Sequence, residues 1–186
     1  MIRRKFLNAV LLIAMAVALP FAGAVTAAAA TGHQIRSSAE ATLTSLYNQN
    51  SVARELGRKA KGILVFPEIT KGGIGIGGSY AEGVLFVNGK PDGNYSVGSG
   101  SLGLTLGAQS FSQVIMFMTQ EALNSFRASR GWEAGVNGSV VAIDEGKATS
   151  YDFTKDQDPI VGFVFGQQGL MFDASFRGAK YTRIKR

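Results

Sequence analysis

Glycine at nearly every second position of one apolar stretch is the feature that most restricts how this chain folds. Residues 60–83 read AKGILVFPEITKGGIGIGGSYAEG. Residues 63–66 are a β-branched and aromatic run, and Pro67, which cannot donate to a ladder, predicts that this buried strand stops there. In residues 73–77 glycine alternates with isoleucine, so one face of the next strand is bulky and the other is bare. We expect a helix, another backbone or a ligand to lie close against the bare face.

The amino-terminal residues have the composition of a secretory signal peptide. Three basic residues at positions 3–5 precede 25 uncharged residues, 6–30, in which a late proline is followed by small residues. We expect residues 1–30 to be a signal peptide cleaved between Ala24 and Ala30, and the protein to be exported to the periplasm or cell envelope. A retained membrane anchor is the alternative, because 25 uncharged residues could span a bilayer.

Composition excludes several classes of function. From Thr31 onward there are 16 basic and 13 acidic residues, an excess too small to indicate nucleic acid as a partner. The chain has no cysteine, which excludes a disulfide framework and thiolate metal sites. The single histidine, His33, lies close to the cleavage region, so neither a Ser-His-Asp arrangement nor a histidine metal cluster can form. We therefore expect no enzyme activity, metal or cofactor.

Two weaker motifs have ordinary structural explanations. The carboxylates of DFTKDQDP, residues 152–159, lack the glycine and the distal glutamate of a calcium loop, so a solvated loop is expected. Residues 73–78 match the glycine spacing of a dinucleotide fingerprint, but SYAEGVLFV follows as a strand and not as a phosphate-facing helix. Close backbone packing is the expected role of these glycines.

The rest of the chain divides into a helical segment, residues 31–61, and a β-rich core, residues 62–186, within one domain. Apolar residues recur at helical spacing in the first segment, with a break expected at 48–51, whereas the second alternates with period two. Asn-Gly at 88–89, Asp-Gly at 92–93 and Glu-Gly at 145–146 predict turns between strands. Thr119 predicts the start of another helix. We predict an α+β fold: an antiparallel, glycine-rich curved sheet or partly closed barrel, with N-terminal amphipathic helices and one helix near 119–128.

A basic amphipathic helix is predicted at residues 51–61. At 100° per residue, Arg54, Arg58 and Lys61 form one stripe, while the apolar residues at 52, 56 and 60 fall on the opposite side. Such a stripe could contact phosphate groups, or it could simply be the solvated face of a helix that is docked on the sheet. Further positive charge is contributed by Lys71 and, as a secondary basic patch near the end of the chain, by Lys180, Arg183, Lys185 and Arg186.

Four ordered blocks of this sequence resemble the SYLF domain, in particular its exported bacterial branch. They are the glycine-rich stretch quoted above, SLGLTLGAQSFSQVIMFMTQEALNSF, GWEAGVNGSVVAI and FVFGQQGLMFDASFRGAKYTRI, and the resemblance covers nearly all of residues 40–184. It implies binding to phosphoinositides and other anionic membranes, as in eukaryotic relatives, or to actin filaments, as in fungal ones. It also implies that Lys71 is the family's lysine after the VFP turn and that the membrane-facing segment corresponds to Arg54, Arg58, Lys59 and Lys61.

These observations lead to a functional hypothesis with two alternatives. We expect a non-enzymatic, peripheral lipid-binding module of the cell envelope that recognises anionic phospholipid head groups through the basic helix. The first alternative is a structural or protein-interaction protein that uses the glycine-rich face or a sheet edge and has envelope proteins as partners. The second is an integral outer-membrane barrel, against which stand the polar helical segment and the basic ending YTRIKR. Export makes actin an improbable partner.

Overall fold

The computed structural model describes residues 31–143, 157–169, 176 and 178–186. The expected signal peptide, the expected turn at residues 145–146 and most of the DFTKDQDP loop lie outside the described residues. The elements are α1 (Gly32–Gln49), α2 (Ser51–Lys59), β1 (Gly62–Val87), β2 (Lys90–Phe117), α3 (Gln120–Ala128), β3 (Trp132–Glu133), β4 (Val141–Ile143), β5 (Ile160–Gly169) and β6 (Lys180–Ile184). This order confirms the predicted α+β class.

Asn50 separates the two N-terminal helices and caps both of them. Its backbone N–H donates to the carbonyl oxygen of Leu46 at 2.9 Å, which ends α1. Its side-chain oxygen accepts from the backbone N–H of Ala53 at 2.8 Å, which begins α2. Thr119 caps α3 in the same way, accepting from the N–H of Ala122 at 3.2 Å. The break at 48–51 and the helix after Thr119 are therefore confirmed.

The strands β1 and β2 form one long antiparallel hairpin that is closed by Asn88 and Gly89. Both residues have positive φ, 52° and 71°, as a type I′ turn requires. The prediction of a second turn, at Asp92-Gly93, was wrong. The partner of Leu85 is Gly93 and that of Phe86 is Pro91, so Asp92 is the extra residue of a bulge inside β2.

Pro67 does not end the first strand, contrary to the prediction. Phe66 pairs with Gln113 and Ile69 pairs with Phe111, so two residues of β1 stand opposite the single Ser112 of β2. The absent N–H of Pro67 falls in this bulge, where no ladder bond is required. Its carbonyl oxygen accepts from the hydroxyl of Ser112 at 2.7 Å. The strand thus continues through the glycine-rich stretch.

Other strands pair with the second edge of β2 and complete the sheet. Among the described residues the order is β3-β6-β2-β5-β4, with β1 on the opposite edge of β2. β6 pairs with residues 94–98 of β2, and β5 with residues 109–117. The pair of β4 and β5 is parallel, whereas the other pairs among the described strands are antiparallel, as predicted for the sheet.

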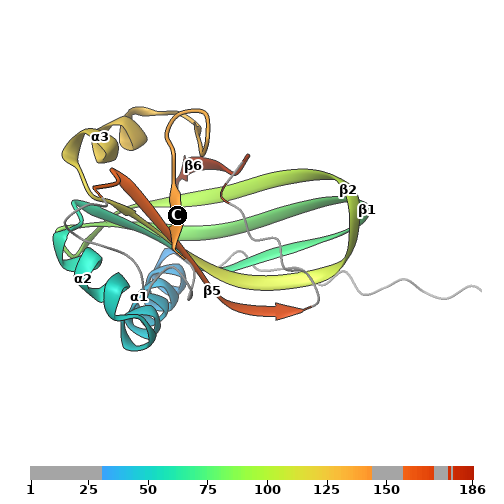
Figure 1. Cartoon of the computed structure of the whole chain (residues 1–186), viewed down its shortest axis with the longest axis horizontal. Helices are drawn as coiled ribbons and strands as arrows, with labels where there is room; N and C mark the ends of the chain where they lie inside the picture. Colours follow the sequence, from blue (N-terminus) through green and yellow to red (C-terminus); the bar gives the residue numbers. More distant parts are fainter. Residues whose placement is uncertain (1–30, 144–156, 170–175, 177) are drawn as a thin grey trace, which may run out of the picture.

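The long hairpin folds back on itself, and the two halves of β1 touch. A Cβ atom added at Gly83 would lie only 2.2 Å from the carbonyl oxygen of Val65. The prediction of a bare face at residues 73–77 concerns the side chains at 74–76, which are not among those described. Gly83, further along the same strand, lies against the backbone of Val65. Figure 1 shows the ribbon of the hairpin curving round, with α1 and α2 on one side of the sheet and α3 on the other.

Two hydrophobic clusters hold these layers together. The first lies within the curve of the sheet and is sealed by α3, whose Phe126 ring packs tilted against Phe117 and edge-on against Trp132. The second lies between the sheet and the N-terminal helices, which contribute Ile35, Ala39, Leu46, Ala53 and Leu56. The basic helix is therefore docked on the sheet by its apolar side.

Candidate functional site

A pocket of about 570 Å³ lies where α1, the end of α2 and the turn of the long hairpin meet. Residues of α1, the 57–63 segment and the hairpin turn approach one another because β1 folds back on itself, which brings Gly83 against Val65. The volume is within the range of about 300–1,000 Å³ that is usual for small-molecule sites. Thirteen residues line it: Glu40, Leu43, Thr44, Tyr47, Gly57, Arg58, Ala60, Lys61, Gly62, Ile63, Phe86, Asn88 and Gly89.

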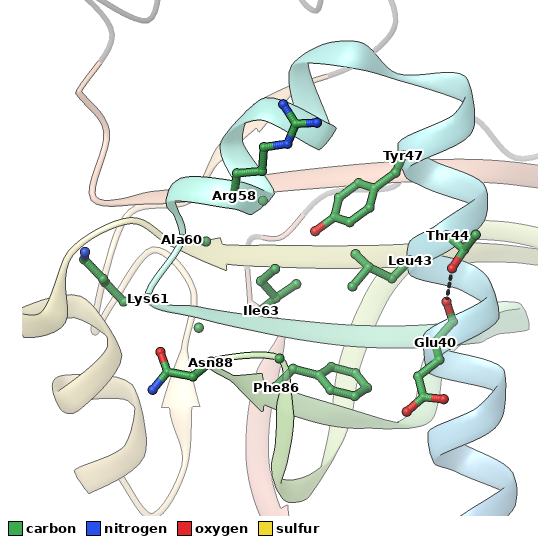
Figure 2. A pocket seen from close by; sticks show the side chains of 13 residues that line it. Glu40, Leu43, Thr44, Tyr47, Arg58, Ala60, Lys61, Ile63, Phe86 and Asn88 are labelled. Atoms are coloured by element: carbon green, nitrogen blue, oxygen red, sulfur yellow. Dashed lines mark hydrogen bonds between the residues drawn. The ribbon is translucent and has the colours of Figure 1, made fainter.

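The floor of the pocket is apolar and its rim is polar. In Figure 2 Leu43, Tyr47, Ile63 and Phe86 surround the hollow, whereas Lys61 points outward. Leu43, Tyr47 and Ile63 pack on the second hydrophobic cluster but stay only half-buried, so apolar surface faces the hollow. This combination suits a molecule with an apolar body and a polar end.

Tyr47 takes its position because Gly57 has no side chain. A Cβ atom at Gly57 would lie 2.1 Å from the Tyr47 hydroxyl oxygen, so only glycine lets the phenol lie against α2. Burial raises the pKa of this phenol above its usual value, so that Tyr47 stays a neutral hydrogen-bonding group at the pocket.

The predicted basic residues at the carboxyl end of α2 gather beside this pocket. We call Arg58, Lys59 and Lys61 the basic cluster. Their side chains are exposed; Arg58 keeps 71% of its side chain in solvent, and Lys59 keeps 54%. Glu55 forms ion pairs with Arg58 at 3.5 Å and with Lys59 at 3.2 Å. Since Glu55 pairs with two of the three cations of the basic cluster and carries one negative charge, the end of α2 keeps a positive excess.

The predicted helix was two residues too long, and this changes the place of Lys61. α2 ends at Lys59, and Lys61 belongs to the link into β1, where its backbone N–H donates to the carbonyl oxygen of Phe117 at 2.8 Å. Lys61 therefore lies beside the helix end and not on the predicted stripe. Only the rim residues Arg58 and Lys61 belong to both the basic cluster and the pocket lining.

Arg54 is exposed, but its guanidinium has a structural partner. Its Nε atom donates to the carbonyl oxygen of Tyr47 at 2.9 Å, and its Nη2 atom donates to the same oxygen. The positive group thus binds a carbonyl in the last turn of α1, where a cation interacts favourably with the helix dipole. Arg54 joins the two helices and is less available to a ligand than Arg58.

The other predicted basic residues lie elsewhere. Lys71 is ten residues beyond Lys61 on β1, on the order of 30 Å along an extended strand, and it pairs with Gln109. Lys180 begins β6 opposite Glu133, and the exposed Lys185 follows this strand. The structure therefore does not bring Lys71 or these tail residues into the basic cluster.

The two arginines of the secondary basic patch are engaged with other groups. Arg183 donates to the carbonyl oxygen of Asp92 at 3.0 Å. Arg186 donates through Nε to the Glu82 carboxylate at 2.9 Å and also through Nη2, and this hydrogen bonding holds the pKa of Glu82 below its usual value. Arg186 lies near Gly32 at the start of α1, where an added Cβ atom would lie 3.5 Å from its own Cβ. Tyr47 is about 22 Å further along this helix.

Within the described residues, no group of three or more His, Cys, Asp or Glu side chains is arranged to hold a metal ion. In the same part of the chain, no helix is long and apolar enough to cross a membrane.

Comparison with known proteins identifies the family. Residues 98–185 match the family model Ysc84, described as Las17-binding protein actin regulator. Residues 98–185 therefore carry a SYLF-family domain, for which Ysc84 is the family model. Beta cell expansion factor A of Aeromonas veronii is 30% identical over 149 residues, which are 79% of this chain and 55% of that protein. The chain thus spans about half the length of this relative. The family supports a lipid- or actin-binding module in general.

The pocket lies outside the segment matched by the family model. That segment begins at residue 98, within β2, whereas the pocket is built from residues 40–63 and 86–89. Sequence reasoning found Arg58 and Lys61 but missed Tyr47 and Phe86. Tyr47 continues the apolar helical spacing of α1 and Phe86 belongs to an alternating strand, so both had the pattern of ordinary core residues.

Proposed function

We propose that this protein is a peripheral lipid-binding module whose basic cluster contacts anionic phospholipid head groups. The observation that carries the proposal is the position of three exposed cations at one helix end, directly beside an apolar pocket. Membership of a family of lipid- or actin-binding modules supports it. The head groups would meet Arg58, Lys59 and Lys61, while the sheet serves as a rigid support.

The energy of such a contact is modest and electrostatic. A Lys or Arg near an anionic bilayer contributes about 1 kcal/mol, so the basic cluster supplies about 3 kcal/mol at most, less the opposing charge of Glu55. Exposed charges are screened over about 10 Å at 0.1 M salt and about 3 Å at 1 M salt. Binding should therefore be reversible and should weaken steeply with ionic strength.

Sedimentation with vesicles tests the proposal. The purified protein is mixed with vesicles of phosphatidylcholine alone or with added phosphatidylglycerol, across a salt series. We expect binding to the anionic vesicles only, lost at high salt. The double variant Arg58→Gln/Lys61→Gln removes two contacts of about 1 kcal/mol each and should weaken partitioning about 30-fold.

A charge-matched variant separates a local site from net charge. Arg130→Gln/Lys185→Gln removes two exposed cations outside the basic cluster and should bind like the wild type. Equal losses in both double variants would show that only overall charge matters. Absence of binding to anionic vesicles at low salt would refute the lipid proposal and would direct the search to protein partners.

We also propose that the protein is exported and acts without catalysis. The support is the composition of residues 1–30 and the lack of cysteine together with a single histidine in the whole sequence. Intact-mass measurement of the protein from an envelope fraction should give a chain that begins between residues 25 and 31. A full-length chain recovered from the cytosol would contradict export.

A further inference from the structure

We infer that the pocket beside the basic cluster holds the hydrocarbon chain of one long-chain fatty acid, with the carboxylate at the Lys61 rim. The inference deepens the proposed function and rests on it for the choice of lipid as the ligand class. It adds a second mode of binding: capture of a single lipid molecule in a cavity, distinct from contact with a charged surface.

The first support is the apolar surface that the fold leaves within the hollow. Leu43, Tyr47, Ala60 and Ile63 are all only half-buried, although each packs on the second hydrophobic cluster. They come from a helix, a helix end and a strand, and together with Phe86 they surround one space (Figure 2). A hydrocarbon chain in that space would remove this surface from water, at about 25 cal/mol per Å².

The second support is the space that the hairpin turn leaves open beside the hollow. Gly89, at this turn, is one of the lining residues. Gly89 has φ of 71°, and a Cβ atom there would meet nothing within 4 Å, so the hairpin turn leaves open space above the strand. The pocket of about 570 Å³ accommodates one hydrocarbon chain, whereas a two-chain phospholipid with its head group is much larger than the cavity.

The third support is the distribution of charge on the rim, which gives the ligand a direction. Arg58 and Lys61 lie at the α2 end of the pocket, and Glu40 lies on α1 (Figure 2). An anionic head is attracted to the first end and repelled by Glu40. The carboxylate therefore belongs near Lys61, and the chain runs over Ile63 toward Leu43.

Fluorescence titration with cis-parinaric acid below its micelle concentration tests the inference on the wild-type protein. Saturated carboxylates of increasing length then compete with the probe. We expect affinity to rise about fourfold for each added methylene group while the chain is still being buried, and to stop rising once the pocket is full. Failure of the probe to bind, or competition that is independent of chain length, would overturn the inference.

Two pairs of variants locate the site. Leu43→Trp fills the pocket and should weaken binding at least tenfold, while Ala41→Trp, at an exposed position of the same helix, should have no effect. Lys61→Gln should abolish the preference for dodecanoate over dodecanol without abolishing dodecanol binding. The inference would be overturned if both tryptophan variants had equal effects, or if the carboxylate preference survived Lys61→Gln. The competition series needs no variant, so it decides the case if Leu43→Trp does not fold.

The outcomes separate this inference from the proposed function. Leu43→Trp should sediment with anionic vesicles like the wild type, because it leaves the basic cluster intact. Vesicle binding without fatty-acid binding would refute the pocket inference alone. Fatty-acid binding without vesicle binding would refute the proposed surface contact and leave the pocket as a lipid site.

Discussion

Replacement of Gly83 by alanine tests the fold-back of the hairpin, on which the pocket depends. The new Cβ atom would lie 2.2 Å from the carbonyl oxygen of Val65 and 2.7 Å from Cδ1 of Phe66. To reach even 3.0 Å, a separation that real Cβ atoms seldom go below, the two halves of β1 would have to part by about 0.8 Å. The clashing oxygen belongs to the backbone of a paired strand, so it cannot rotate away as a side chain can.

The expected loss of stability is at the upper end of the overpacking range, about 3 kcal/mol. For a domain of about 150 residues this lowers Tm by about 6–12 °C. Gly78→Ala is the matched control on the same strand. Gly78 is exposed, and an added Cβ atom would lie at an ordinary 3.5 Å from its nearest neighbour, the Ser99 carbonyl oxygen. Both changes restrict the unfolded chain alike, by about 0.4–1 kcal/mol, so their difference isolates the contact with Val65.

Thermal and urea unfolding of the two variants measure that difference. Gly83→Ala should unfold well below the wild type, and Gly78→Ala should equal or slightly exceed it. If the two variants unfold together, the close contact of Gly83 with Val65 does not exist in solution. The fold-back that brings Phe86 toward Ile63 would then also be in doubt.

Two further changes test local interactions. Glu82→Gln removes the carboxylate that accepts a hydrogen bond from Arg186. This hydrogen bond lowers the pKa of Glu82 in the folded protein. The bond therefore stabilises the fold fully above about pH 4.5, and the stabilisation is lost as the pH falls through the lower folded-state pKa. Urea unfolding should therefore separate wild type and variant at pH 7 and bring them together near pH 2, and a gap that persists in acid would refute this assignment. Asn50→Ala removes the cap of α2 and should cost about 1 kcal/mol in urea unfolding, whereas no loss would show that the cap is dispensable.

Features encoded by neighbouring residues could be predicted from the sequence. Thr119 begins a helix because its hydroxyl reaches an N–H three residues away, and Asn88-Gly89 turns the chain because both residues tolerate positive φ. The residues that decide these features are close together in the chain. The resemblance to the SYLF family was likewise visible in the order of four blocks.

Features that depend on a partner strand could not be predicted in the same way. Pro67 and Asp92 both lie in bulges, where the count of residues on the opposite strand decides whether the chain turns or continues. The parallel pairing of β4 with β5 joins segments that are separated by many residues. The pocket depends on the contact between Gly83 and Val65, which are far apart in the chain. From the sequence, its apolar lining residues therefore could not be distinguished from core residues. The rim cations Arg58 and Lys61 could be predicted, because they belong to one short basic segment.

The docked state of α2 decides which kind of membrane contact is favoured. Ala53 and Leu56 are buried against the sheet, and full burial of a leucine alone is worth about 2 kcal/mol. Insertion of the helix into lipid would first lose this burial and then regain a similar amount from the bilayer, so undocking brings little net gain. The cations of the basic cluster already face solvent in the docked state, and their attraction to anionic lipid requires no rearrangement. Binding through the docked helix is therefore favoured, and its salt dependence, more than its dependence on apolar residues of α2, should distinguish it from insertion.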